Sequence, residues 1–210
     1  KIVAITGSNG KTTTTLLVGH ILEKAGYDVL VAGNIGTGFS KSISERDYDY
    51  IVLELSSFQL DGIKDFKADI AILLNITPDH LDRYEYSFEN YIQSKLQITN
   101  NQNKNDVFIY NYDDTNIREK SNTKAKMIPF SLNKEFETDG AFYKNNEINI
   151  NLNNNEMTIQ DLALQGKHNV YNSMAAAVAS RVLEVKDLII RKSLQDFKNI
   201  EHRLEHVINI

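Results

Sequence analysis

The sequence predicts an α/β fold: a doubly wound, mostly parallel sheet with a phosphate-binding loop, plus a small antiparallel subsheet. Short apolar runs alternate with helical patterns along the first half of the chain. Several of these runs are apolar almost without interruption, as expected of parallel strands buried on both faces. A glycine-rich turn that ends in Gly-Lys-Thr joins the first run to the first helical pattern.

The elements of the main sheet follow from periodicity and turn signals. Strands are predicted at residues 2–6, 27–32, 50–55, 68–74 and 106–110. Helices are predicted at residues 12–25, about 35–45, 57–65, 87–99, 168–184 and 186–197. Gly26 is expected to end the first helix. This alternation indicates a doubly wound sheet, whose ligands bind beyond the carboxyl ends of the strands.

The region from about 130 to 165 has a different character. Asn-rich turns at 144–146 and 153–155 separate three short runs, 141–143, 148–152 and 156–160. Short runs between such turns are typical of hairpins. We therefore predict an antiparallel subsheet that packs on the main domain.

Composition restricts the function classes. The 210 residues are 41% apolar and 24% charged, with a formal net charge of −5. An acidic chain lacks the basic face of nucleic-acid proteins, so no nucleic acid is expected as a partner, although a nucleotide ligand stays open. No run reaches the ~18 apolar residues of a membrane span, so no membrane partner is expected. The absence of cysteine excludes disulfides, thiolate zinc sites and cysteine nucleophiles.

The chain is expected to be one domain, residues 1–210, excised from a longer protein. It has no initiator Met and no signal peptide, it begins on a predicted core strand, and it stops at Ile210 in another apolar run.

The segment ITGSNGKTT, residues 5–13, is the strongest local signal. Gly7 and Gly10 let backbone N–H groups turn inward, Lys11 supplies a charge for phosphates, and Thr12 offers a hydroxyl to Mg²⁺. Ile5 stands where the general pattern has its first glycine, so the loop is a shortened variant. The alternative is a glycine turn with a surface lysine.

Two further strand ends carry polar side chains. Glu54 ends an apolar strand, and a carboxylate there is costly unless it is paired or binds a metal. The turn TPDHLDRY, residues 77–84, places His80 between Asp79 and Asp82, so His80 is a candidate metal ligand with an acidic neighbour. The alternatives are that Glu54 has reached solvent and that His80 is structural. Lys95, in YIQSKLQI, is by itself best interpreted as a surface lysine with a buried stem.

Taken together, seven segments resemble the Mur ligase family. They are TGSNGKTT (6–13), AGNIGT (32–37), LELSSFQL (53–60), LNITPDHLDRY (74–84), YIQSKLQI (91–98), GKHNVYNSMAAA (166–177) and HRLE (202–205). Their order and spacing cover nearly the whole chain. The S-S-F-Q and G-N-I-G elements favour the branch that adds D-glutamate to UDP-N-acetylmuramoyl-L-alanine.

The resemblance implies a role for each matched residue. Lys11 would bind phosphate, Thr12 and Glu54 would serve one Mg²⁺, and His80 with a carbamylated Lys95 would serve a second. The residues implied to hold ATP are Gly7, Ser8, Asn9, Gly10, Lys11, Thr12, Thr13, Asn169, Asn172 and Arg203. Those implied to act in catalysis are Lys11, His80, Lys95 and Arg203. Those implied to face the UDP-muramoyl substrate are Asn34, Ser56 and Gln59. Glu201 replaces the proline that the family often has before His-Arg.

The resemblance also implies an activity: ATP-dependent, ADP-forming amide ligation through an acyl phosphate, in cytoplasmic peptidoglycan precursor synthesis, by a monomer. The family's N-terminal UDP-binding domain and C-terminal amino-acid-binding domain are expected to be missing from this chain, which would leave it inactive alone. The alternatives are another Mur ligase, a folylpolyglutamate synthetase, or a nucleotide-binding module without catalysis.

Overall fold

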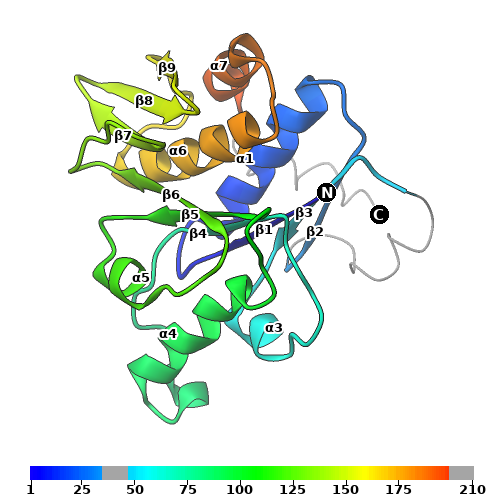
Figure 1. The fold of residues 1–210 in the computed structure, drawn as a ribbon, viewed down its shortest axis with the longest axis vertical. Helices are drawn as coiled ribbons and strands as arrows, with labels where there is room; N and C mark the ends of the chain where they lie inside the picture. The colour runs from blue at the N-terminus through cyan, green and yellow to red at the C-terminus, as the bar shows by residue number, and fades with distance from the viewer. Residues whose placement is uncertain (35–46, 199–210) are drawn as a thin grey trace, which may run out of the picture.

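The computed structural model describes residues 1–34 and 47–198. Their strands form a single sheet in the order β2-β3-β1-β4-β5-β6-β7-β8-β9 (Figure 1). The strands are β1 Ile2–Thr6, β2 Val29–Gly33, β3 Tyr50–Glu54, β4 Ile70–Leu73, β5 Val107–Asn111, β6 Lys126–Ser131, β7 Gly140–Lys144, β8 Glu147–Leu152 and β9 Asn155–Ile159. Strands β2 to β7 pair in parallel along this order, and the last two pairs are antiparallel.

Helices cover both faces of the sheet. They are α1 Lys11–Lys24, α3 Ser57–Asp61, α4 Phe88–Leu96, α5 Thr115–Lys120, α6 Lys167–Val182 and α7 Asp187–Asp196, with short 3₁₀ helices at Leu81–Tyr84 and Gln97–Thr99. Residues of α1, α6 and α7 share one buried apolar cluster, and residues of α3, α4 and α5 share another (Figure 1). This arrangement confirms the predicted doubly wound α/β class.

The central strand β1 lies between β3 and β4, with Ala4 level with Leu53 on one side and Ala71 on the other. Its residues Val3, Ala4 and Ile5 have no exposed surface. A strand covered on both faces and flanked by two neighbours favours apolar residues at every position, which explains the apolar run from Ile2 to Ile5. Because β2 to β7 pair in parallel, the carboxyl ends of these strands all lie at one edge of the sheet.

The predicted hairpins are present, but their placement differs from the prediction. β7 pairs in parallel with β6, so the antiparallel strands continue the main sheet instead of forming a separate layer packed on it. Ile148, Ile150 and Met157 of these strands share a core with α1, α6 and α7. The turn residues Asn145, Asn146, Asn153 and Asn154 all have positive φ, which explains why these turns are Asn-rich.

Two elements were not predicted, strand β6 and helix α5. Strand β6 contains Pro129 and begins with Lys126, both unusual within a parallel sheet, and α5 is only six residues long. The helix predicted at about 35–45 and the apolar run at the C-terminus lie outside the described residues. Within residues 1–34 and 47–198, no helix is long and apolar enough to cross a membrane.

Candidate nucleotide and metal site at the carboxyl edge of the sheet

The phosphate-binding loop joins β1 to α1 and is in close contact with helix α6. Gly10 has φ 85°, and a Cβ placed on it would lie 2.3 Å from Asn172 Oδ1. A Cβ on Gly7 would lie 3.0 Å from Leu74 Cβ. Any larger residue at Gly10 would therefore be strained in its backbone and would also collide with α6.

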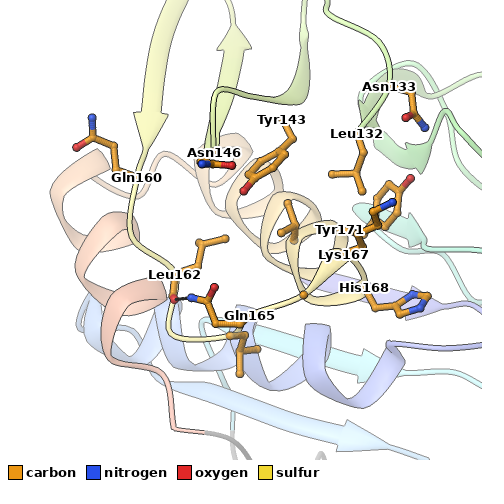
Figure 2. A pocket seen from close by; sticks show the side chains of 13 residues that line it. Leu132, Asn133, Tyr143, Asn146, Gln160, Leu162, Gln165, Lys167, His168 and Tyr171 are labelled. Atoms are coloured by element: carbon orange, nitrogen blue, oxygen red, sulfur yellow. Dashed lines mark hydrogen bonds between the residues drawn. The ribbon is translucent and has the colours of Figure 1, made fainter.

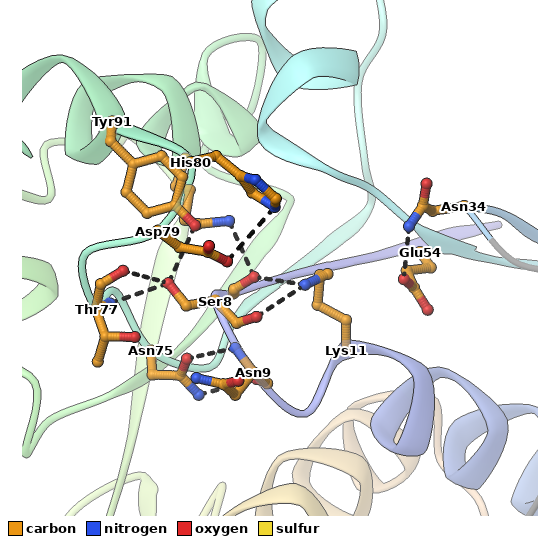
Figure 3. Close-up of polar contacts among 12 residues, drawn as sticks. Ser8, Asn9, Lys11, Asn34, Glu54, Asn75, Thr77, Asp79, His80 and Tyr91 are labelled. Atoms are coloured by element: carbon orange, nitrogen blue, oxygen red, sulfur yellow. Dashed lines mark hydrogen bonds and ion pairs between the residues drawn. The ribbon is translucent and has the colours of Figure 1, made fainter. Parts of the chain in front are cut away.

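Two side chains, Ser8 of the loop and Asn75 of the segment after β4, attach the loop to that segment. Ser8 Oγ donates to the Thr77 carbonyl (2.9 Å), accepts from the Thr77 N–H (3.0 Å) and lies 3.1 Å from the Tyr91 hydroxyl. Asn75 accepts from the Asn9 N–H (2.8 Å) and donates to the Asn9 carbonyl (2.9 Å) (Figure 3). These hydrogen bonds to residues 75 and 77 thus fix the shape of the loop without a bound ligand.

The Lys11 side chain folds back over the loop. Its Nζ donates to the carbonyls of Gly7 and Ser8, both at 3.0 Å (Figure 3). Helix α1 begins after Gly10, which makes no side-chain capping bond. The N–H groups of its first turn are therefore available to an anion, and the positive end of the helix dipole points the same way.

Thr12 and Glu54 form a part-buried oxygen pair beside the loop. The Thr12 hydroxyl donates to Glu54 Oε2 at 2.7 Å. Asn34 Nδ2 donates to Glu54 Oε1 at 3.2 Å (Figure 3). Glu54 is only 2% exposed. The alternative in which Glu54 simply reaches solvent is therefore wrong.

Lys95 is buried behind the phosphate loop. It is 2% exposed, its Nζ donates to the Gly7 carbonyl at 2.9 Å, and Nζ lies 4.8 Å from the centre of the Tyr91 ring. Burial, together with the neighbouring charge of Lys11, lowers the pKa of Lys95 to about 7. The interpretation of Lys95 as a surface lysine is wrong, because α4 turns this side chain toward the loop.

His80 lines the same cavity as Lys11 and Lys95 and has a left-handed backbone conformation with φ 49°. Its Nε2 is 3.6 Å from Asp79 Oδ2, and its ring centre is 5.7 Å from that of Phe58. A cavity of about 140 Å³ brings five of the predicted site residues together. It is lined by Lys11, Asn34, Ser56, Ser57, Phe58, Asp79, His80, Tyr91 and Lys95.

Ser56 and Gln59 form a capping box at the start of α3. Ser56 Oγ accepts from the Gln59 N–H (3.3 Å), while Gln59 Oε1 accepts from the Ser56 N–H (2.8 Å). Ser56 lines the cavity with His80, whereas Gln59 lines a separate groove of about 270 Å³. The S-S-F-Q motif thus has a structural role in starting this helix.

The pair Asn169 and Asn172 lies at the start of α6. Asn172 abuts Gly10, and Asn169 Nδ2 donates to the Gln165 carbonyl at 2.8 Å. The same end of α6 borders a larger cavity of about 730 Å³, lined by residues that include Tyr143, Lys167 and His168 (Figure 2). Arg203, Glu201, the HRLE segment and the end of AGNIGT lie outside the described residues.

Comparison with known proteins identifies the family. The model of the Mur ligase middle domain matches residues 5–180. The chain belongs to the Mur ligase family. The UDP-N-acetylmuramoylalanine--D-glutamate ligase of Christiangramia forsetii is 50% identical over 214 residues, covering 100% of this chain and 48% of that protein. The ligase of the same name from Bacteroides fragilis is 47% identical, with the same coverage.

Solved structures of Mur ligases share the fold. MurF from Acinetobacter baumannii gives a TM-score of 0.74 at 24% identity, covering 97% of this chain and 47% of that one. MurF from Thermotoga maritima, solved in complex with ADP, gives 0.68 at 19% identity, covering 95% and 48%. The chain spans about half the length of the curated relatives it matches.

Sequence reasoning missed two residues that hold the segment after β4 in place beside the candidate site. Asp114 accepts from the Ile76 N–H at 2.6 Å, and Asn111 Nδ2 donates to the Leu74 carbonyl at 3.0 Å. Both hold the segment that carries His80. The available signal was Asn-Tyr-Asp-Asp, which begins at the last residue of the buried strand β5, at the same sheet edge as Glu54.

Proposed function

We propose that this chain is the ATP-binding catalytic domain of an ADP-forming amide ligase that adds D-glutamate to UDP-N-acetylmuramoyl-L-alanine. The observation that carries the catalytic part is the burial of Lys95 beside the loop lysine, in one cavity with His80. The names of relatives 45–50% identical over 98–100% of the chain favour D-glutamate over the substrates of other Mur ligases.

Binding of ATP is assigned to the loop and to the start of α1. The Lys11 ammonium, now shared between two loop carbonyls, would exchange them for phosphate oxygens. The free N–H groups of the α1 first turn, from Lys11 to Thr13, would bind the same phosphates. We assign adenine to Asn169 and Asn172, and Arg203 to the γ-phosphate, because these residues match the family motifs.

The donor atoms beside the loop fit Mg²⁺. Thr12 and Glu54 offer hard oxygen atoms, and Mg²⁺ in phosphate-transfer sites is held by one or two protein oxygens together with phosphates and water. The described residues hold no cluster of three or more His, Cys, Asp or Glu that could bind a metal without such help. A second Mg²⁺ is assigned to His80 and Lys95, with Lys95 carbamylated.

The environment of Lys95 favours carbamylation. With a pKa of about 7, about half of its amine is neutral at neutral pH, and a neutral amine can attack CO₂. The new N–C bond forms as the nitrogen loses a proton, which yields a carbamate anion. This anion would replace the repulsion between Lys95 and Lys11 with attraction, and it would offer the oxygen ligands that Mg²⁺ prefers.

In the proposed reaction, the carboxylate of the muramoyl substrate attacks the ATP γ-phosphate, which yields an acyl phosphate and ADP. The amine of D-glutamate then attacks the acyl carbon and phosphate leaves. The metal ions would neutralise charge on the transferred group. Lys11 and the α1 N-terminus would stabilise the same charge, while Asn34 and Ser56 would contact the substrate across the cavity, with Gln59 holding Ser56 in place.

We place this reaction in the cytoplasm, as part of peptidoglycan precursor synthesis, and propose that the protein is a monomer. A nucleotide-binding module without catalysis has no use for a buried lysine and a histidine in one cavity beside the loop. That contrast favours a ligase.

Replacing Lys95 tests the catalytic proposal in the complete protein. Lys95→Ala is expected to release phosphate at least 100-fold more slowly than the wild type with both substrates, ATP and Mg²⁺. A short carboxylate such as acetate should restore part of this rate, because the lost group is an anionic metal ligand. Lys104→Ala, at an exposed lysine, should keep full activity. Full activity of Lys95→Ala without acetate would refute the proposal.

A further inference from the structure

The ring of His80 has little polar support. Its backbone is left-handed, its side chain is 59% exposed, and its Nε2 lies 3.6 Å from Asp79 Oδ2, beyond hydrogen-bond distance. A metal ligand with a free ring would sample several rotamers, and ordering it would weaken metal binding. Besides the 3.6 Å approach to Asp79, a packing contact is the remaining candidate among the described residues for setting the direction of this ring.

Phe58 is the residue in position to do so. Its ring lies 5.7 Å from the His80 ring at an interplanar angle of 58°, within the range of favourable aromatic contacts. On its other sides, Phe58 stacks on Tyr84 at 6.1 Å and 10°, and the Arg83 guanidinium lies 4.7 Å from its centre. Phe58 itself is 38% exposed and lines the same cavity as His80.

Two features hold Phe58 in place: the start of its own helix and the buried ring of Tyr84. The capping box of Ser56 and Gln59 sets the first turn of α3, which carries Phe58. The Tyr84 hydroxyl donates to Asp61 Oδ2 at 3.0 Å and lies 3.2 Å from Ser94 Oγ, and Tyr84 is buried. A row of rings, Tyr84, Phe58 and His80, thus connects the buried core to the site.

We propose that Phe58 is a positioning residue that holds the His80 imidazole toward the lysine pair. This inference has a metal consequence, a loss of metal affinity when Phe58 is replaced, and only this consequence rests on the proposed function. Its structural content, that the Phe58 ring sets the His80 ring direction, stands on the ring geometry alone.

The structural content is tested by histidine-selective NMR of the complete protein. The His80 ring resonances, assigned with His80→Gln, should be displaced from those of an exposed histidine by the Phe58 ring current. Phe58→Leu should remove this displacement, and Phe58→Tyr should retain it. Tyr86→Leu is the matched control, because Tyr86 is an aromatic residue of the same region, 81% exposed. Unchanged His80 resonances in Phe58→Leu would overturn the inference. Phe58→Met provides the same test if the leucine variant does not fold.

The metal consequence is tested by Mn²⁺ titration with a non-hydrolysable ATP analogue. Phe58→Leu should weaken Mn²⁺ binding about tenfold, the usual effect of removing a residue that orients a ligand. The same change in a His80→Ala background should have no further effect. An equal loss with and without His80 would mean that Phe58 affects Mn²⁺ binding independently of His80, and would overturn the inference. If His80→Ala alone leaves Mn²⁺ binding unchanged, the metal role in the proposed function fails, and the NMR result still decides the ring contact.

Discussion

The lowered pKa of Lys95 affects the stability of the fold as well as the reactivity of the amine. Burial and the charge of Lys11 lower its pKa to about 7, well below the ordinary lysine value. Between pH 7 and about 10.5 the unfolded chain therefore binds more protons at this position than the folded chain, and stability rises with pH across this window. Below about pH 7 the charge is buried in the folded state, and its full cost is present.

Lys95→Met should therefore stabilise the protein in CO₂-free buffer. We expect the free energy of unfolding to rise by about 1–3 kcal/mol at pH 6, because a buried charge is replaced by an apolar side chain of similar length. The gain should shrink toward pH 10, where the wild-type lysine is already neutral in the folded state. Urea unfolding at both values measures it, with the exposed Lys104→Met as control. A methionine variant less stable than wild type at pH 6 would contradict this account.

Lys11 is expected to be the largest single contributor to nucleotide affinity. Its ammonium lies over the loop, at the amino end of α1, where phosphates would bind. Lys11→Ala should remove most of the affinity for an ATP analogue with Mg²⁺, while the exposed Lys64→Ala should not. Calorimetric titration provides the measurement, and equal affinity of the Lys11 variant and wild type would reject the loop assignment.

At the scale of elements, the contact between the phosphate loop and α6 depends on one glycine. Gly10 and Gly26 have similar backbone angles, φ 85° and 91°, so alanine is strained at both. A Cβ on Gly26 would meet nothing within 4 Å, whereas on Gly10 it would meet Asn172 at 2.3 Å. Comparing alanine variants at the two positions therefore separates the cost of backbone strain from the cost of a steric collision.

Gly10→Ala is accordingly expected to cost more than Gly26→Ala. Both should lose about 1–2 kcal/mol of unfolding free energy from left-handed strain, and Gly10→Ala about 1–3 kcal/mol more from overpacking. It should also weaken ATP binding, because the loop or α6 has to shift. The double variant Gly10→Ala/Asn172→Ala should lose less than the sum of its single changes. Equal losses at Gly10 and Gly26 in urea unfolding would show that α6 does not restrain the loop.

At the scale of the whole molecule, the sheet is continuous from β2 to β9 over the described residues. One core holds Ile150 of β8 together with residues of β1, α1, α6 and α7. The antiparallel strands are therefore not an independent unit, and they should unfold with the parallel part.

Ile150→Ala tests this continuity. It should lower the free energy of unfolding by about 2–4 kcal/mol in the main transition, because a fully buried side chain is lost from the shared core. Far-UV circular dichroism and tyrosine fluorescence should still give coincident curves in urea. Glu156→Ala, at an exposed position of the same subsheet, should change little. A separate early transition confined to the variant would show that the hairpins fold on their own.

Local sequence patterns were enough to predict the α/β class, the loop and most elements. Apolar runs predicted the buried strands, and the Gly-Lys-Thr turn predicted the loop between β1 and α1. Asn pairs predicted the hairpin turns through their tolerance of positive φ. Helix α5 and strand β6 were missed because one is short and the other carries Lys126 and Pro129.

The contacts and the burial of the polar residues, in contrast, depend on how distant segments pack together. Lys95 has the local pattern of a surface lysine, and only the packing of α4 beside the loop brings its Nζ to the Gly7 carbonyl. Phe58 and His80 are 22 positions apart in the sequence, and their ring contact depends on how α3 sits beside the turn after β4. Burial and pairing are properties of segments distant in the chain, and no local pattern contains them.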